Sequence, residues 1–245
     1  MQKSIFQRTE IVLGQETMCV LQTTRVILFG LGGVGSWCAE SLVRTGIGHI
    51  TLVDFDTVCE TNINRQLPAT AKTVGQKKVE VIAQRLLEIN PQLSITIRPD
   101  LYTPETAHSF QIHTYDVIID AIDTVHNKLH LIREATKTEA FFISSMGAGR
   151  KIEPGMIKVA EFWDVHYCLF ARRLRKLIRK GELPHKPFLC VYSVEQTEES
   201  HEVETVNSIS KRINGTLAHI TAIFGFTIAG EVVKYIFKQK NMLVK

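Results

Sequence analysis

The segment NINRQ gathers polar side chains directly after a run that predicts the second buried strand of the chain. Arg65 carries a planar set of donors that matches phosphate oxygens, and Asn64 and Gln66 add neutral donors beside it. Lys78 in GQKK, near the start of a predicted helix, can place a point charge on the same anion. Asn62 by itself is better explained as a capping or exposed loop residue. Together these side chains suit a triphosphate, whereas a dinucleotide pyrophosphate that is already held by a glycine-rich loop needs none of them.

A glycine-rich loop, FGLGGVGSW, follows a predicted strand and opens a predicted helix. The glycines that fit or extend the GxGxxG pattern are Gly30, Gly32, Gly33 and Gly35. Backbone amides and the positive end of the helix can then meet phosphate, although a tight turn without a ligand is the alternative for the loop alone. Asp54 follows at the end of the next strand, where a carboxylate accepts ribose hydroxyls, and we assign Asp56 to the same nucleotide. NAD and ATP both carry that ribose, so the loop leaves the nucleotide open.

Two carboxylates, Asp120 and Asp123, end and follow the predicted strand in VIIDAIDT. A carboxylate at this point can hold Mg²⁺ against substrate phosphates, and we assign Asp123 as that ligand. The predicted catalytic residues are Asn64, Arg65, Lys78 and Asp123. Several polar elements around one crevice at the carboxyl ends of the strands predict a nucleotide site there.

The elements that must position these residues alternate along the chain as strand and helix. Short β-branched apolar runs predict buried parallel strands at 25–30, 49–54, 93–99, 115–120 and 140–145. Helical patterns lie between them at 34–46, at 75–90, in a short stretch from Pro104, and at 124–138. One face of the helix at 75–90 is expected to carry Val79, Ile82, Ala83, Leu86 and Leu87. This alternation predicts an α/β fold with a doubly wound, Rossmann-like, mostly parallel sheet.

The pattern loosens after Gly149. There follow MIKVAEFW, a basic stretch at 171–186, a strand-like FLCVYS at 188–193 and an acidic loop at 194–204. No linker rich in Gly, Ser or Pro separates the halves. We therefore expect a single domain over 1–245, with a nucleotide-binding half at about 1–150 and a C-terminal elaboration at about 151–245 for substrate binding and dimer contact.

Composition narrows the class of protein. A formal charge of +4 and a pI of about 8.8 permit a polyanionic partner where the basic residues cluster. Five cysteines without a CxxC pair indicate neither a zinc ribbon nor a disulfide framework, so we expect no structural zinc and a reducing cytoplasm. Cys168 and Cys190 are expected to be buried thiols, and no catalytic cysteine is assigned. The N-terminus lacks the pattern of a secretory signal.

The most apolar segment, at 216–237, is long enough to span a membrane, but His219, Glu231 and Lys234 fall inside it. Because charge in hydrocarbon is costly, we expect a buried or dimer-packing helix and regard membrane contact as the weaker alternative, with a peripheral contact left open.

The motifs GLGGVGS, VDFDTVCETNINRQ, GQKKVE and DAID occur in this order over about residues 25–125. In this order and spacing they resemble the E1-like adenylyltransferases of the ubiquitin-activating-enzyme superfamily. The resemblance implies that the nucleotide is MgATP, that a carboxylate attacks its α-phosphate, and that the enzyme is a homodimer. It also implies that the glycines and Asp54 hold the nucleotide, that Asn64, Arg65, Gln66 and Lys78 act on the triphosphate, and that Asp123 binds magnesium. Arg8 in FQRTE would reach the ATP of the partner subunit.

The second half resembles the tRNA threonylcarbamoyladenosine dehydratase branch of that superfamily. The matching segments are SSMGAGRKIEPGMIKVAEFW, RRLRKLIRKGE, VYSVEQ and NGTLAHITAIFGFTIAGEVV, although the usual DPT and PLA elements of the branch are replaced. The branch implies an ATP-dependent enzyme that cyclises the threonylcarbamoyl group on adenosine 37 of tRNA, with help from a cysteine-desulfurase system.

On this interpretation the densest basic run binds the tRNA backbone by neutralising phosphates. Its members are Arg172, Arg173, Arg175, Lys176, Arg179 and Lys180. A solvated helix face is the simpler explanation. Three other functions stay open: an adenylyltransferase that activates the C-terminus of a ubiquitin-like sulfur carrier, a nucleotide-binding scaffold without turnover, and an NAD-dependent oxidoreductase, which leaves Arg65, Gln66 and Lys78 unexplained.

Overall fold

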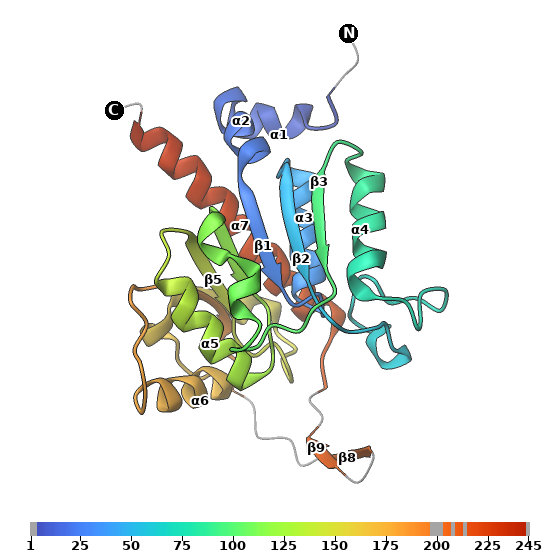
Figure 1. Cartoon of the computed structure of the whole chain (residues 1–245), viewed down its shortest axis with the longest axis vertical. Helices are drawn as coiled ribbons and strands as arrows, with labels where there is room; N and C mark the ends of the chain where they lie inside the picture. The colour runs from blue at the N-terminus through green and yellow to red at the C-terminus, as the bar shows by residue number, and fades with distance from the viewer. Residues whose placement is uncertain (1–3, 197–202, 207–208, 213–214, 244–245) are drawn as a thin grey trace.

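Seven strands form one sheet in the order β3-β2-β1-β4-β5-β7-β6 in the computed structural model, which describes residues 4–196, 203–206, 209–212 and 215–243 (Figure 1). The strands are β1 (Arg25–Phe29), β2 (His49–Val53), β3 (Ser94–Arg98), β4 (Val117–Asp120), β5 (Phe141–Ser145), β6 (Ile157–Glu161) and β7 (Leu189–Ser193). Every neighbouring pair is parallel except β6 and β7. The predicted fold class is confirmed, and the strand order reverses between β1 and β4, where doubly wound sheets bind ligands at the carboxyl ends of the strands.

The central strands owe their burial to their apolar runs. In β1, β2 and β5 every residue after the first is buried, and β4 is buried throughout. The strand β3 differs, because none of its residues is fully buried. The expectation of a buried strand at 93–99 is therefore wrong, and the reason is that β3 lies at the edge of the sheet, where it has only one neighbouring strand.

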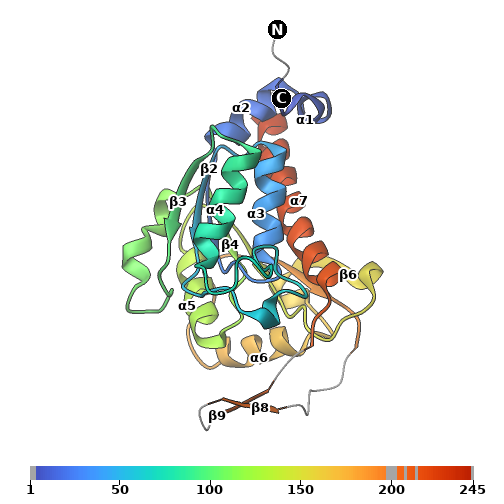
Figure 2. The ribbon, with the colours of Figure 1, turned by 90° about the vertical axis from the view of Figure 1, so that its right-hand side faces the viewer.

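Helices cover both faces of the sheet (Figures 1 and 2). On one face α3 (Gly35–Thr45), α4 (Lys78–Ile89) and α7 (Ala218–Leu243) share an apolar core with the strands. On the other face α5 (Val125–Thr136) and α6 (Leu169–Ile178) share a second core. Two short helices, α1 (Gln7–Leu13) and α2 (Gln15–Thr23), precede β1 and lie at the amino ends of the strands.

Two helical predictions need correction. The predicted inward face of α4 is right for four of its members, but Leu87 is 38% exposed, because a residue next to buried Leu86 is turned by about 100° around the helix. The stretch from Pro104 forms two 3₁₀ turns, η2 (Ala107–Phe110) and η3 (Ile112–Thr114), in place of an α-helix. Gln111 between them has a φ of 46°, which interrupts any continuous helix.

The second half of the chain continues the same sheet. The strand β7 pairs with β5, and β6 closes the edge in the antiparallel direction. Sequence reasoning did not assign a strand to MIKVAEFW, which contributes β6. A hairpin of β8 (Val203–Val206) and β9 (Ile209–Arg212) follows, so residues 203–204 of the predicted acidic loop belong to a strand. Residues 197–202 of that loop lie outside the described residues.

The long helix α7 satisfies the length and composition of a membrane span over Ala218–Lys240, with a mean hydropathy of 1.5. Half of that window is nevertheless buried inside the chain, where α7 packs along α3 and against β5. This packing agrees with the expected buried helix.

Candidate active site

The glycine-rich loop turns from β1 into α3 at the carboxyl edge of the sheet. Gly30 has a φ of 89°, and a Cβ there would lie 2.7 Å from the carbonyl oxygen of Ala121, just after β4. A Cβ on Gly35 would overlap the carbonyl oxygen of Gly30. Around Gly32 the space is open, with Gln66 Nε2 3.8 Å from its virtual Cβ. Gly30 and Gly35 therefore let the loop pass close to β4, and Gly32 leaves its backbone accessible.

Gly33 has a neighbour from the far end of the chain. A Cβ on Gly33 would lie 3.0 Å from Cβ of Thr221, in the first turn of α7. Just before α7, the carbonyl oxygen of Thr216 accepts a hydrogen bond from Asn64 Nδ2 at 2.9 Å. The start of α7 thus forms part of the site, and the glycine at 33 allows this close packing as well as any approach of phosphate.

Asp54 stabilises the glycine-rich loop through a hydrogen bond. Its Oδ2 accepts the backbone N–H of Leu31 at 2.6 Å, and its Oδ1 accepts that of Asp56 at 2.9 Å. Burial raises the pKa of Asp54 above its ordinary value, while the positive charge of Lys78 opposes that rise. Since each carboxylate oxygen can accept a second hydrogen bond, Asp54 can support the loop and still receive ribose hydroxyls.

Lys78 lies at the first position of α4, as its place in GQKK predicted. The side chain is buried, and Nζ donates to Asp56 Oδ2 at 2.7 Å. The Asp56 side chain is about half exposed. A bound anion can therefore share the Lys78 ammonium with Asp56, because an ammonium has three donors.

In the NINRQ segment, Asn62 caps a short helical turn, whereas Arg65 keeps donors available for a ligand. Asn62 Oδ1 accepts the backbone N–H of Cys59 at 3.1 Å, so the interpretation of Asn62 as a cap is confirmed. Arg65 Nη1 donates to the carbonyl oxygen of Thr61 and to Asn64 Oδ1, both at 2.8 Å. These bonds hold the guanidinium against its own turn. Its Nε and Nη2 have no hydrogen-bond partner within the described part of the chain, so they stay available to an anion.

Gln66 carries an unsatisfied polar atom at the same place. Its side chain is buried beside Gly32, and Oε1 has no hydrogen-bond partner among the residues that the structure describes. The hydroxyl of Thr216 is unsatisfied in the same way. Buried polar atoms without a partner are costly, so these two groups indicate that a ligand or water belongs here.

Asp120 and Asp123 have different surroundings. Asp120 is fully buried, and its Oδ2 accepts Lys128 Nζ at 2.8 Å and Ser144 Oγ at 2.7 Å. Its Oδ1 accepts the backbone N–H of Ile122 at 3.0 Å. Asp123, three residues on, is exposed and accepts only the Thr124 hydroxyl, at 3.4 Å, among the described contacts. Asp123 is therefore the carboxylate available to a metal ion or a ligand.

Arg8 and the glycine-rich loop lie at opposite ends of the sheet. Arg8 is exposed on α1, at the amino ends of the strands, whereas the loop and residues 54–77 lie at the carboxyl ends (Figure 1). Within one chain these groups do not meet. A role of Arg8 at the nucleotide thus requires a second copy of the chain.

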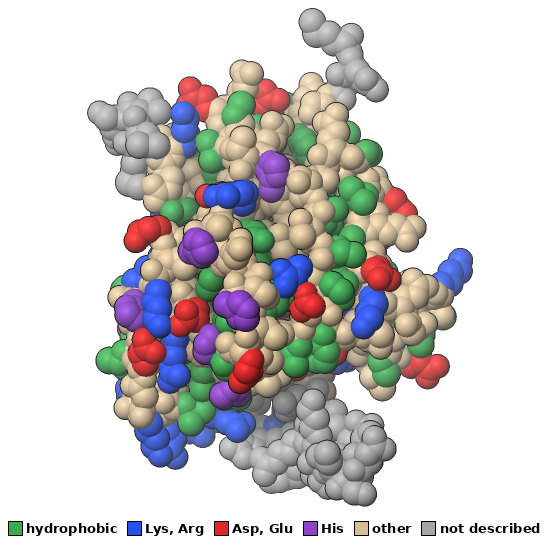
Figure 3. All heavy atoms as spheres, viewed as in Figure 1, with side chains coloured by type: hydrophobic (Ala, Val, Ile, Leu, Met, Phe, Trp, Pro, Cys, Tyr) green, Lys and Arg blue, Asp and Glu red, His purple; other side chains and the backbone are tan. Residues whose placement is uncertain are grey.

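The predicted basic run lies on and just after α6. Ala171, Leu174 and Ile178 are the buried face of the helix, and the cations occupy the rest of its surface. Figure 3 shows Lys and Arg side chains gathered over this end of the molecule.

The expected thiols Cys168 and Cys190 are buried, and burial raises the pKa of Cys190 well above its ordinary value. A thiol in that setting is a poor nucleophile.

Sequence reasoning missed three residues around these sites. Lys128 neutralises Asp120, and a lysine on the inward face of the 124–138 helical pattern was the available signal. Trp163 lies beside the basic helix, in the FW pair shortly before it in the sequence. The part played by Thr221 had no local signal, because it depends on how α7 packs.

This arrangement gathers the backbone amides of the glycine-rich loop, the carboxylate of Asp54, two cations and the exposed carboxylate of Asp123 at the carboxyl edge of the sheet. Such a site is equipped to bind a nucleoside triphosphate and to stabilise charge on its phosphates.

The chain is similar to known proteins over nearly its whole length. The model of the ThiF family matches residues 6–245. The tRNA threonylcarbamoyladenosine dehydratase of Bacillus subtilis is 41% identical over 175 residues, which are 71% of this chain and 69% of the relative. The protein of that name from Haemophilus influenzae is 34% identical over 238 residues, 92% of this chain and 90% of its own.

A solved structure extends the similarity to three dimensions. The E. coli tRNA N6-threonylcarbamoyladenosine dehydratase in complex with ATP superposes with a TM-score of 0.86 and is 32% identical. The superposition covers 97% of this chain and 95% of the other. The similarity therefore includes the C-terminal elaboration as well as the nucleotide-binding half, and the chain belongs to the ThiF family.

Proposed function

We propose that this protein is an ATP-dependent tRNA threonylcarbamoyladenosine dehydratase, which cyclises the N6-threonylcarbamoyl group of adenosine 37. The observation that carries the proposal is the similarity to proteins of that name over 90% or more of both chains, one of them bound to ATP. The cations Arg65 and Lys78 support a triphosphate nucleotide, and the unsatisfied Gln66 Oε1 supports a bound group that donates a hydrogen bond.

The chemistry follows from the poor reactivity of a carboxylate. The threonine carboxylate attacks the α-phosphorus of ATP, and pyrophosphate leaves. The ureido group then attacks the activated acyl carbon, loses a proton and expels AMP, so that the nucleoside loses one water. Because both groups belong to one substituent, the second step is intramolecular and gains the advantage of proximity.

The protein's part is to hold the phosphates and the charge that develops on them. The amides of the loop at 30–35 and the helix end meet phosphate, and Asp54 and Asp56 face the ribose side. Arg65, Lys78, Asn64 and Gln66 supply donors to the triphosphate. No covalent intermediate with a cysteine is needed.

Asp123 fits a magnesium ligand. Mg²⁺ in nucleotide sites is usually held by one or two carboxylates together with substrate phosphates. The exposed carboxylate of Asp123 follows the Ala121 carbonyl that contacts Gly30, so it lies on the loop next to the phosphate-binding turn. When bound, Mg²⁺ would neutralise charge on the phosphates.

The tRNA is proposed to lie on the basic helix α6. Arg172, Arg173, Lys176, Arg179 and Lys180 are exposed, and Arg175 is half-buried. The plot of log K for tRNA binding against log salt concentration becomes steeper by roughly 0.7 to 0.9 for each phosphate that a cation neutralises. Reversal of charge at Arg175 and Arg179 should therefore weaken tRNA binding and flatten its salt dependence while ATP binding is kept.

A homodimer is proposed to complete the site with Arg8. Ile11 and Val12, on the same helix, are 78% and 76% exposed, which favours an apolar contact at this end of the molecule. If Arg8 acts in trans, a mixture of Arg8→Ala and Lys78→Ala chains should recover activity, because one site of each mixed dimer keeps both residues. Absence of recovery in isolated mixed dimers would contradict the role of Arg8.

The remaining assignments follow the proposed reaction. We place the enzyme in the cytoplasm, where its tRNA and ATP are found, with a cysteine-desulfurase system as a further partner. The division at about residue 150, into a nucleotide-binding half and a half for substrate and dimer contact, belongs to the same proposal. The start of α7 at the glycine-rich loop means that the second half also contributes to the nucleotide site.

An adenylyltransferase of a ubiquitin-like sulfur carrier is the second candidate, because it would use the same first half of the chain. The two are separated by the acceptor that makes ATP cleavage proceed. We expect threonylcarbamoyl-modified tRNA to stimulate release of AMP and pyrophosphate in equal amounts. Pyrophosphate exchange that depends on a carrier protein ending in Gly-Gly, with no effect of the tRNA, would favour the second candidate.

A further inference from the structure

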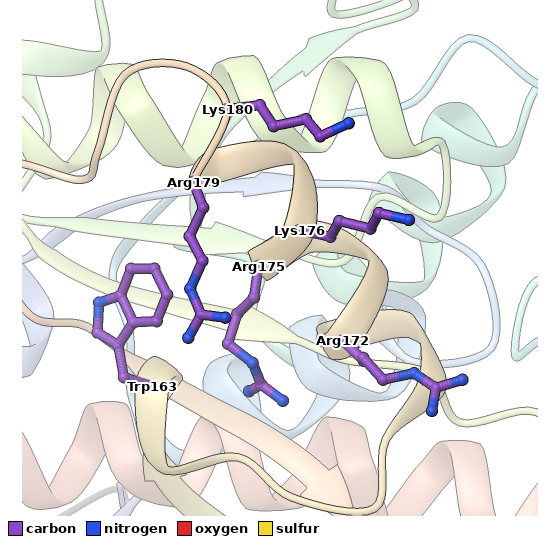
Figure 4. Close-up of a pocket in the computed structure, with 6 residues that line it drawn as sticks. All are labelled: Trp163, Arg172, Arg175, Lys176, Arg179 and Lys180. Carbon is purple, nitrogen blue, oxygen red and sulfur yellow. The ribbon is translucent and has the colours of Figure 1, made fainter.

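An open depression of about 610 Å³ lies beside α6 (Figure 4). Its lining, among the described residues, is one aromatic side chain and five cations: Trp163, Arg172, Arg175, Lys176, Arg179 and Lys180. Ligand sites commonly have volumes of about 300–1,000 Å³. The lining is unusual for a small apolar ligand and suits an anion that also carries a flat ring.

The cations of this depression have no carboxylate partner among the residues that the structure describes. None of the five forms an ion pair with a carboxylate in the described part of the chain, where the ion pairs involve other residues. Arg175 Nη1 donates to the carbonyl oxygen of Phe162 at 3.0 Å. Uncompensated charge of one sign on a single surface attracts a polyanion.

Trp163 is held in a fixed position at this surface. It belongs to the 3₁₀ turn η5 (Phe162–Asp164), where its backbone N–H donates to Glu161 Oε2 at 3.0 Å. The preceding Phe162 is fully buried and stacks on Phe188 with 4.9 Å between ring centroids. The Arg179 guanidinium lies over the indole, 5.5 Å from its ring centroid. Trp163 as a whole is still 38% exposed, so part of the residue is open to a ligand.

We propose that Trp163 is a stacking site for one unpaired base of the bound RNA, flanked by phosphate contacts from α6. The proposal rests on the proposed function in taking tRNA as the ligand. Proteins that bind single-stranded nucleic acid combine a cationic groove with aromatic rings on which bases stack, and arginine adds cation–π attraction. An acidic peptide or a lipid headgroup would use the cations but would leave the exposed part of the indole uncovered.

The position of the depression fits an RNA whose modified loop must reach the nucleotide. Both ribbon views place α6 toward the same end of the molecule as the segment 54–77, which follows the carboxyl end of β2 (Figures 1 and 2). Bases in an RNA duplex have their faces covered by neighbours, whereas loop bases can be splayed onto aromatic side chains. We therefore infer that the base comes from the anticodon loop and not from a stem.

Binding of two RNA probes to three proteins tests this. The probes are the anticodon stem-loop of the substrate tRNA and a fully paired hairpin of equal length, and the proteins are wild type, Trp163→Ala and Trp163→Phe. A stacked base contributes enough that Trp163→Ala should weaken binding of the stem-loop roughly five- to hundredfold, with Trp163→Phe between it and wild type. Binding of the paired hairpin should change less than twofold, on the order of 0.4 kcal/mol or below.

Salt dependence separates stacking from charge. Trp163→Ala should shift the stem-loop affinity equally at every salt concentration, because stacking releases no counterions. The matched control, Lys176→Ala in the same depression, should reduce the slope by roughly 0.7 to 0.9 and weaken both probes. Quenching of tryptophan fluorescence by the stem-loop in wild type should be absent in Trp163→Phe, which keeps the second tryptophan, Trp37.

The outcomes distinguish this proposal from the proposed function. If wild type cyclises the modified tRNA but Trp163→Ala binds the stem-loop as tightly as wild type, the stacking site is refuted and the function stands. If the stem-loop binds in a Trp163-dependent way and no cyclic product forms, the function fails and the stacking site stands. Equal losses for both probes, or binding of phosphatidylglycerol vesicles with no RNA binding, would overturn the stacking site.

Discussion

Replacing Lys128 with methionine removes one half of a fully buried ion pair. Lys128 Nζ lies 2.8 Å from Asp120 Oδ2, both side chains have no exposed surface, and Nζ also donates to the carbonyl oxygen of Ile122 at 3.0 Å. Without the ammonium, the Asp120 carboxylate keeps the Ser144 hydroxyl and the Ile122 amide as donors but has no compensating charge. Breaking such a pair costs about 3–5 kcal/mol.

The loss should be visible as a lower midpoint of thermal unfolding. For a chain of about 250 residues, 1 kcal/mol corresponds to roughly 2–4 °C, so Lys128→Met should lower Tm by about 6–20 °C. Calorimetry at fixed protein concentration measures this, with urea unfolding as a second method. The control is the double variant Asp120→Asn with Lys128→Met, which removes both charges and should recover much of the stability.

A loss below about 1 kcal/mol for Lys128→Met would refute the reasoning, because it would mean that the carboxylate finds solvent or protonates without cost. A double variant less stable than the single one would refute it as well.

Further predictions concern the glycine-rich loop, a second ion-pair cluster and the triphosphate cation. Gly35→Ala should abolish ATP binding in a calorimetric titration, since its Cβ would overlap the carbonyl oxygen of Gly30; retained binding would contradict the loop geometry. Burial alone would raise the pKa of Glu40, but its hydrogen bonds from two arginines hold the pKa below 4.5. Glu40→Gln should therefore cost about 1.5–3 kcal/mol of unfolding free energy near neutral pH. This stabilisation is complete above the unfolded-state pKa and is lost as pH falls through the lowered folded pKa, so a pH-independent difference in urea unfolding would contradict it. Lys78→Met should lower the rate of AMP release about 10²- to 10³-fold. The control is Lys77→Met, at the preceding residue, which is not assigned to the nucleotide site; its rate should stay within threefold of wild type. Equal effects of the two substitutions would contradict the assignment of Lys78.

Most of the fold could be predicted from patterns among residues that are neighbours in the sequence. The apolar runs of β1, β2, β4 and β5 and the GxGxxG turn were predictable, because their residues are neighbours in sequence and their physical reasons are local. The exposure of β3 was not, since it depends on which strand ends the sheet. The strand β6 was missed because an antiparallel edge strand, partly exposed along its length, has no continuous apolar run.

The site was predictable where residue type decides the chemistry. Asp54, Arg65, Gln66 and Lys78 all lie at the carboxyl edge that the topology rule indicates. The packing of Thr221 on Gly33 depends on contacts between the two ends of the chain and has no sequence pattern. Trp163 was missed because an aromatic residue before a basic run is usually buried, and its exposure appears only when η5 is seen beside α6.

The central claim is that this enzyme removes water from a modified nucleoside at the expense of ATP. The most direct measurement incubates the protein with ATP, Mg²⁺ and threonylcarbamoyl-modified tRNA, then digests the tRNA and determines the mass of the modified nucleoside. We predict that the nucleoside loses the mass of one water, only with ATP present, and that Lys78→Met forms little of this product. An unchanged nucleoside mass in the presence of ATP turnover would contradict the claim.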